Sequence, residues 1–165
     1  MYFKLQERLP EFTVTRVTME NLSFYESIFF SNEEYYRLTD GNPATRKTCE
    51  DTIDSFPPHQ VYSIGISRQE EAVAFLSILN GYPDVETLYI GLLLVDEKYK
   101  RKSVGTLITK AILTTASELG FKKLKLSVQE NNLSGLKFWR KMGFYEKDRC
   151  ACDGFDNLSM QYDIK

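Results

Sequence analysis

The chain has 165 residues, of which 42% are hydrophobic and 27% charged, values typical of a folded domain with its own core. Its 21 basic and 23 acidic residues give a formal net charge of −2, which argues against a protein that mainly binds the nucleic-acid backbone. The longest apolar stretch, 90–95, is far shorter than the roughly 20 residues that span a bilayer, and the N-terminus lacks the apolar segment of a signal peptide. We therefore expect a single domain over 1–165 in the cytoplasm, with no membrane and no nucleic-acid partner.

Three cysteines and one histidine give little support to a disulfide or metal site. Cys49 stands alone, and Cys150 and Cys152 are separated by one residue. An odd cysteine count without a second pair is a poor disulfide framework, and the set lacks the ligand spacing of a zinc site. We expect Cys150 and Cys152 to be small, buried or half-buried strand residues, His59 to lie on the surface in its proline-bounded loop, and no metal to be bound.

The first half of the chain predicts an antiparallel arrangement. Alternating and β-branched residues indicate strands, and turn residues such as Asp40-Gly41-Asn42-Pro43 separate the segments. The predicted strands cover 12–18, 61–67, 72–80 and 87–95. The predicted helices cover 19–30 and 32–38, with a weakly helical stretch over 44–56.

The second half adds a strand–helix–strand crossover. Apolar residues at helical spacing predict a helix over 104–119, which Gly120 ends, and Asn132 is a suitable N-cap for a second helix over 133–142. The predicted strands cover 123–128, 144–150 and 158–164. The order predicts an α/β fold of the α+β type: a mixed, mostly antiparallel sheet of six to seven strands with about four helices on both faces.

The turn after the strand that ends at Val95 carries the strongest functional signal. It contains four basic residues among 98–102 and leads directly into the N-terminus of a predicted helix at Val104. Backbone N–H groups at a helix N-terminus have no intrahelical partner, and the helix dipole favours an anion there. Gly105 would let a pyrophosphate approach the backbone closely. The structural alternative is a solvated basic turn before an ordinary helix cap.

The segments 92–106 and 132–144 resemble the GNAT superfamily of acyl-CoA N-acyltransferases. The first is similar to its Gln/Arg-x-x-Gly-x-Gly/Ala signature, the second to its Asn-x-x-Ala-x-x-x-Tyr-x-x-x-Gly-Phe segment. The resemblance covers about 12–164 and implies a GNAT-like fold. It also implies acetyl-CoA as co-substrate and direct transfer of acetyl to a primary amine of a small molecule or peptide, with a homodimer plausible. A non-catalytic acyl-CoA-binding module or sensor is the alternative.

The resemblance also implies roles for individual residues. Lys100 occupies the Gln/Arg position of the signature, and Ser103 and Gly105 occupy its two glycine positions. The backbone N–H groups that would cradle the pyrophosphate belong to Arg101, Lys102, Ser103, Val104, Gly105 and Thr106, with the Lys102 side chain pairing with phosphate. The residues that would hold the pantetheine arm are Leu93 and Val95 through their main chains and Asn132 from the far side, while an N–H of Leu93 or Leu94 would polarise the thioester carbonyl.

Two departures from the family pattern bear on catalysis. Ser103 adds a Cβ close to the expected phosphate, although its hydroxyl could donate to it. Trp139 stands where many members have a tyrosine that protonates the leaving thiolate, and an indole cannot do this at neutral pH. Water, Tyr145 or Ser127 could replace that acid, or none is required. Trp139 is then expected to pack beside the cofactor.

The base and the acceptor wall are less defined. The position of the carboxylate base in some members corresponds to Tyr89, which we expect to line the acceptor pocket, with Glu86 or Asp84 as candidate bases. Loss of one such group typically costs about 10² to 10⁴ in rate, so activity would survive its absence. The segments 33–36 and 40–59 lie where the family builds its acceptor wall. Glu33 and Glu34 could attract a cationic amine or could form a solvated helix face.

Overall fold

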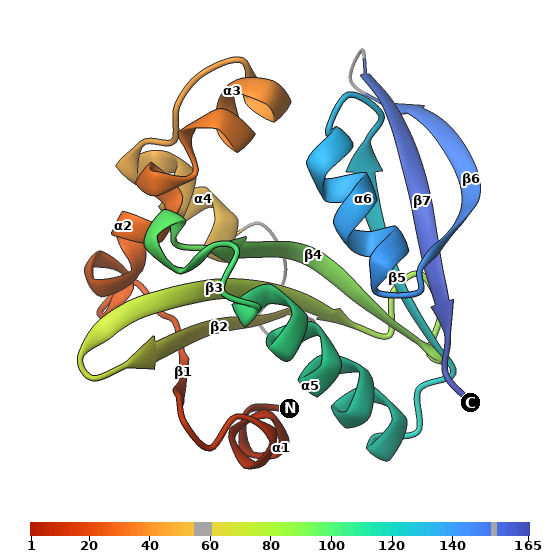
Figure 1. Ribbon diagram of the computed structural model, residues 1–165, viewed down its shortest axis with the longest axis horizontal. Coiled ribbons are helices and arrows are strands. Elements are labelled where there is room, and N and C mark those ends of the chain that lie inside the picture. Colours follow the sequence, from red (N-terminus) through yellow and green to blue (C-terminus); the bar gives the residue numbers. More distant parts are fainter. Residues whose placement is uncertain (55–60, 153–154) are drawn as a thin grey trace.

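A computed structural model describes residues 1–54, 61–152 and 155–165. The described residues form one seven-stranded sheet with the strand order β1-β2-β3-β4-β5-β7-β6 (Figure 1). The strands are β1 (Thr13–Arg16), β2 (Val61–Arg68), β3 (Glu71–Asn80), β4 (Thr87–Val95), β5 (Lys123–Gln129), β6 (Tyr145–Cys152) and β7 (Phe155–Asp163). The α-helices are α1 (Tyr2–Arg8), α2 (Leu22–Ser31), α3 (Glu33–Asp40), α4 (Arg46–Asp54), α5 (Val104–Glu118) and α6 (Leu133–Lys141).

The expected fold class is confirmed, with more helices than expected. All neighbouring strands pair antiparallel except β4 and β5, which the α5 crossover makes parallel. The described residues contain six α-helices where about four were expected. The additional ones are α1, which the sequence pattern did not suggest, and α4, which covers most of the weakly helical stretch. None of the helices in the described ranges is long and apolar enough to cross a membrane.

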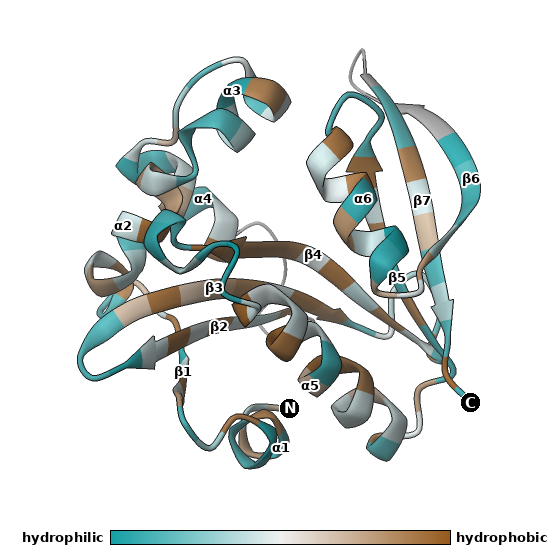
Figure 2. Ribbon diagram, viewed as in Figure 1, coloured by the Kyte–Doolittle hydropathy of each residue, from teal (hydrophilic) through white to brown (hydrophobic). Residues whose placement is uncertain are grey.

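Two hydrophobic clusters lie on opposite faces of the sheet. One joins α1, α5 and α6 to the sheet through buried residues that include Leu88, Ile90 and Leu126. The other joins α2, α3 and α4 to Phe75 and Leu94, and it draws no buried residue from the described parts of β5, β6 or β7. Figure 2 shows the difference: β3 and β4 are hydrophobic along most of their length, whereas polar and apolar residues alternate along β7. The second face of the C-terminal strands is therefore polar.

Of the histidine and the three cysteines, only Cys49 has a side chain within the described part of the structure. His59 lies outside the described residues, and Cys150 and Cys152 lie on β6 with their side chains outside the described part. Cys49 is buried in α4, and burial raises the pKa of its thiol to about 11. A thiol with that pKa stays protonated and unreactive at neutral pH.

The strands β4 and β5 are paired along only part of their length. Their parallel ladder runs from Thr87–Lys123 to Ile90–Leu126 and includes no later residue of either strand. The register between β3 and β4 shifts between Ser77 and Ile78, so that Gly91 is an extra residue in β4, a β-bulge. Beyond the bulge, β4 pairs only with β3, and the gap between β4 and β5 opens toward α3 and α6 (Figure 1).

Candidate active site

The main chain of β4 presents hydrogen-bonding groups to this gap. The N–H of Asp96 donates to the carbonyl of Val73 on β3 at 2.9 Å, so the main chain of Asp96 faces β3. Main-chain direction alternates along a strand, which turns Leu94 toward β3 and Leu93 toward the gap. Leu93 therefore has the orientation that a thioester-polarising N–H requires. Leu94 does not, and its buried side chain packs in the second hydrophobic cluster.

The end of β4 is held by the C-terminal end of α2. Asn32, 4% exposed, donates from Nδ2 to the carbonyl of Val95 at 3.0 Å and to that of Ile28 at 2.7 Å. The hydroxyl of Ser31 accepts from the N–H of Glu97 at 3.2 Å. Asn32 thus takes one of the two acceptor positions of the Val95 carbonyl, while the N–H of Val95 stays available to a pantetheine arm. The sequence analysis missed Asn32, although a polar residue between two helical segments was its available signal.

The turn after β4 has the conformation of an anion-binding loop. Asp96 accepts from the N–H of Lys98 at 3.1 Å and caps the short 3₁₀ helix Glu97–Tyr99. Arg101 and Ser103 then adopt positive φ angles of 59° and 62°, and Ser103 is the N-cap of α5. This reversal directs successive N–H groups of the turn and of the first turn of α5 to one side, where they and the helix dipole favour a phosphate.

The four basic side chains of the turn differ in their partners. Lys98 pairs with Glu71 at 3.0 Å and Lys100 with Glu97 at 2.6 Å. Within the described ranges, Arg101 and Lys102 form no ion pair, and the Lys102 ammonium lies 5.6 Å from the centre of the Tyr99 ring. Arg101 and Lys102 therefore carry the charge that is free to meet a phosphate, while Lys100 would first have to leave Glu97.

Gly105 lies where three elements converge. A Cβ built at this position would lie 3.5 Å from the Phe138 ring and 3.7 Å from Val95, ordinary contact distances, and its φ angle is not positive. The glycine is therefore not required by backbone conformation. It keeps the N-terminus of α5 close to β4 and α6, and a side chain larger than alanine would push against Phe138. Val104 is buried, so only its main chain faces the turn.

Asn132 caps a helix and Trp139 packs in the core, as the sequence analysis expected of both. The Oδ1 atom of Asn132 accepts from the N–H of Gly135 at 2.9 Å and caps α6. Its Nδ2 atom has no hydrogen bond within the described part of the chain and remains able to donate to a ligand. Trp139 is 9% exposed and packs edge-on against Phe138 and Phe144, as expected of a packing residue beside the site.

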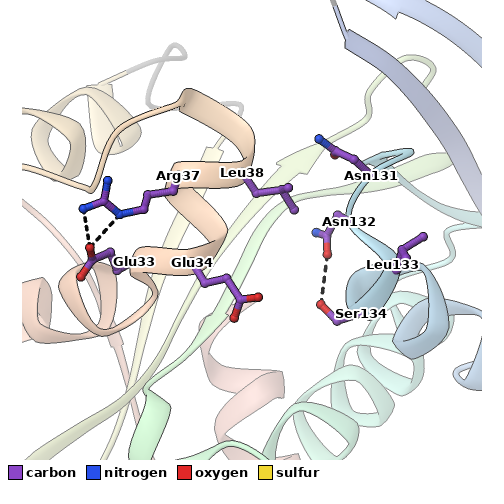
Figure 3. A pocket seen from close by; sticks show the side chains of 8 residues that line it. All are labelled: Glu33, Glu34, Arg37, Leu38, Asn131, Asn132, Leu133 and Ser134. Atoms are coloured by element: carbon purple, nitrogen blue, oxygen red, sulfur yellow. Dashed lines mark hydrogen bonds and ion pairs between the residues drawn. The ribbon is translucent and has the colours of Figure 1, made fainter.

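An open pocket of about 770 Å³ lies between α3 and the turn before α6 (Figure 3). Its lining residues are Glu33, Glu34, Arg37, Leu38, Asn131, Asn132, Leu133 and Ser134. Arg37 neutralises Glu33 at 2.7 Å, while Glu34 and Leu38 point toward the opposite wall. Tyr36 turns into the core instead, and burial raises the pKa of neighbouring Tyr35 to about 12. At the far side of α3, Nε2 of Gln129 donates to the carbonyl of Thr39 at 3.3 Å.

Tyr89 and Ser127 meet at the point where β4 and β5 part. Tyr89 pairs with Lys125 in register, and Ser127 is the next β5 residue on the same face. The Ser127 side chain lies close enough to the Tyr89 phenol to counter part of the rise in its pKa, and the Tyr82 ring lies edge-on to Tyr89 at 5.3 Å. Burial raises the pKa of Tyr89 above its usual 10.0, so its phenol stays protonated at neutral pH. Tyr89 can therefore line the acceptor side of the gap and form hydrogen bonds, but it cannot be a base.

Three other candidates for proton transfer lie away from the gap. Tyr145 is on β6, three strand spacings or about 14 Å from Tyr89, and its hydroxyl donates to Asp163 at 2.7 Å. Glu86 precedes the paired end of β4 and lies 3.9 Å from the Lys123 ammonium. Asp84 accepts from the Thr87 hydroxyl at 2.9 Å and stabilises the turn before β4. The structure brings none of these three to the parting strands.

Comparison with known proteins agrees with this geometry. The family model of the acetyltransferase (GNAT) family matches residues 21–144. The chain is 24% identical to a peptidyl-lysine N-acetyltransferase, YjaB, of Salmonella typhimurium, covering 67% of this chain and 68% of that protein. It is 21% identical to an uncharacterised N-acetyltransferase, YobR, of Bacillus subtilis, covering 68% of this chain and only 44% of that protein, so the chain spans less than half of that relative.

A solved structure extends the likeness to the whole fold. An acetyltransferase from Thermus thermophilus superposes with a TM-score of 0.76 at 19% identity, covering 92% of this chain and 96% of that one. The matched family segment contains the parting strands, the anion-binding turn and α6, which together form the candidate site. The chain belongs to the acetyltransferase (GNAT) family, whose members transfer acetyl from acetyl-CoA, as the sequence resemblance implied.

Proposed function

We propose that this protein transfers the acetyl group of acetyl-CoA directly to a primary amine, with both substrates bound at once. The observation that carries the proposal is the combination of a parted β4–β5 pair with an anion-binding turn at the end of the same β4 strand. The turn suits a pyrophosphate, and the gap suits an extended arm that bonds to a strand edge. The two features are continuous, as one ligand with both chemical parts would require.

Bound acetyl-CoA would supply the activated acyl group, and the chain would supply position and polarisation. The N–H groups of residues 101–106 and the side chains of Arg101 and Lys102 would hold the pyrophosphate. The N–H groups of Leu93 and Val95 and Nδ2 of Asn132 would hold the arm, with the Leu93 N–H directed at the thioester carbonyl. Alignment of an unprotonated amine with that carbonyl supplies several orders of magnitude in rate without a dedicated base.

The first experiment is an acetyl-CoA titration monitored by melting temperature, with ATP and NAD as controls. Ligand at about 100 times its dissociation constant stabilises a folded protein by about 2.7 kcal/mol, which is readily seen as a shift. We expect a shift with acetyl-CoA and none of comparable size with the controls. Equal shifts with all three ligands, or no shift, would contradict the cofactor assignment, and acetyl-CoA binding without amine-dependent CoA release would favour the binding-module alternative.

A variant of the turn localises the site. Lys102→Ala should weaken acetyl-CoA binding by about ten- to a hundredfold, because one charge-assisted contact is lost while the backbone donors remain. The matched control is Lys110→Ala, which removes an exposed lysine from the middle of α5, the helix that follows the turn. Equal weakening by both variants would mean that overall charge, and not the turn, attracts the ligand.

A further inference from the structure

The second face of β5 and β7 presents three chemically distinct side chains beside the parted strands. Main-chain alternation places Lys125 and Ser127 on the face opposite α6, because Leu124, Leu126 and Val128 pack into the cluster that α5 and α6 cover. Tyr89, the register partner of Lys125 on β4, completes the group beside Ser127. The helices α5 and α6 flank the cofactor side, so the amine has to reach the thioester from the face that carries these residues.

The charges around this group favour an anion at Lys125. Lys125 is half-buried between Tyr89 and Gln161, its register partners on the two neighbouring strands. It forms no ion pair within 4.0 Å among the described residues, and its charge is one of the smaller causes that lower the pKa of Asp84. Asp163, the other acid near this face, is engaged, because it accepts from Tyr145 and from Gln161 Nε2.

The spacing of the three groups corresponds to a small bifunctional ligand. Residues paired across neighbouring strands have Cβ atoms about 5 Å apart, and residues two apart on one strand are about 7 Å apart. The Tyr89–Ser127 hydroxyl pair lies beside the gap where the acetyl group would arrive. Lys125 is the register partner of Tyr89 and lies two residues before Ser127 on β5. A ligand that bonds to both would carry its amine and its anionic group a few bonds apart.

We propose that Tyr89, Ser127 and Lys125 form the acceptor subsite and that the acceptor is a primary amine bearing a carboxylate, of the amino-acid class. The hydroxyl pair orients the amine through neutral hydrogen bonds, and Lys125 binds the carboxylate. This inference rests on the proposed acetyl transfer and specifies its acceptor. A polycationic amine would be repelled by Lys125 and would depend on Glu34 at the rim of the pocket instead.

The test compares amino acids with their amides in an assay of CoA release. We expect the enzyme to acetylate phenylalanine in preference to phenylalaninamide and to spermidine. Lys125→Gln should raise the KM for phenylalanine by about ten- to a hundredfold and leave the KM for the amide unchanged, because a single charge-assisted bond is removed. The control is Lys123→Gln. Lys123 lies two register rows further from the gap than Lys125, and its ammonium is 3.9 Å from Glu86.

Each other outcome overturns the proposal. Equal use of acid and amide would remove the need for a cationic anchor, and preference for spermidine would assign recognition to Glu34. An enzyme that binds acetyl-CoA but releases no CoA with any of these amines would exclude the amino-acid class while leaving the cofactor site intact. Absence of acetyl-CoA binding is a separate result, seen in the melting experiment before any amine is added, and contradicts the proposed function itself.

Discussion

Ser103 is the residue at which this chain departs most clearly from the glycine of the family signature, and its backbone shows the cost. Its φ angle of 62° is in the left-handed region, which costs a residue with a Cβ about 1–2 kcal/mol. The hydroxyl of Ser103 can donate to a phosphate, which a glycine cannot do. We infer that the chain retains a strained serine in a loop where other members have a relaxed glycine.

The backbone strain at Ser103 leads to a prediction about the free energy of unfolding. Ser103→Gly should raise the free energy of unfolding by about 0.5–1 kcal/mol, because relief of the left-handed strain is only partly offset by the greater freedom of glycine in the unfolded chain. Urea unfolding measures the change. The matched control is Ser117→Gly near the end of α5, which should lower the free energy by about 0.5 kcal/mol because glycine weakens a helix. A destabilised Ser103→Gly variant would show that the hydroxyl stabilises the loop without any ligand.

Two helices show how single contacts at their ends position the site. The C-terminal end of α2 fixes β4 through Asn32 and Val95, and the N-terminal end of α6 is capped by Asn132 beside the proposed arm of the cofactor. In Asn132 one side chain combines both roles. Its Oδ1 atom stabilises α6, and its Nδ2 atom, which has no hydrogen bond within the described part of the chain, would donate to the proposed cofactor arm.

Asn132→Asp separates those roles. An aspartate keeps the oxygen that accepts from Gly135 and suits a helix N-terminus. The free energy of unfolding should therefore change by less than about 1 kcal/mol, which the melting temperature checks. It has no amide donor and places a negative charge beside the cofactor arm, so acetyl-CoA affinity should fall by about tenfold or more. Asn132→Ala should lose about 1 kcal/mol of stability in addition. Unchanged acetyl-CoA affinity in Asn132→Asp would limit Asn132 to helix capping.

The helix α1 is anchored by charge as well as by packing. Lys4 and Arg8 both pair with Glu118, the last residue of α5. The hydrogen bonds from Arg8 and Lys4 lower the pKa of the Glu118 carboxyl below its ordinary value of 4.5. A lowered pKa in the folded state stabilises the fold above the ordinary pKa, and this contribution is lost as the pH falls through the lowered value. The attachment of α1 should therefore weaken in acid.

Glu118→Gln tests this contribution. The variant should melt below the wild type at neutral pH, and the difference should disappear well below pH 4, where the wild-type carboxyl is protonated as well. The control is Glu7→Gln, which changes an exposed carboxylate on α1 itself. A difference in melting temperature that persists in acid would mean that Glu118 acts by packing, and not through its charge.

At the scale of the whole molecule, the sequence predicted the sheet and the turn but not how side chains are used. Alternation, β-branched residues and short apolar runs between turn residues predicted all seven strands, and the basic residues before Val104 predicted the anion-binding loop. The helix α1 was missed because it has only seven residues, with Leu5 as its one buried residue. The β-bulge at Gly91 was missed because a single glycine in an apolar strand does not show which strand pair gains the extra residue.

The roles of the site's side chains depend on distances between residues far apart in the chain, and the sequence pattern does not contain these distances. Tyr145 was a candidate acid because of its chemistry, and only the strand order shows that β7 and β5 separate it from β4. Lys125 was unremarkable as one of many lysines, and its position beside Tyr89 follows from the register of the parallel ladder. The part of the site built from main-chain conformation was predictable, and the part built from tertiary neighbours was not.

The short ladder between β4 and β5 has a mechanical consequence. The described residues form two parts, β1–β4 with five helices and β5–β7 with α6. Four residue pairs of the β4–β5 ladder join the two parts, together with the hydrophobic cluster that α5 and α6 cover and the contact of Gln129 with α3. A cofactor arm that fills the gap would touch both parts and so help to hold them at one angle. The acyl donor would then stabilise the arrangement of the two parts as well as serve as substrate. This stabilisation would last in each catalytic cycle only until CoA leaves.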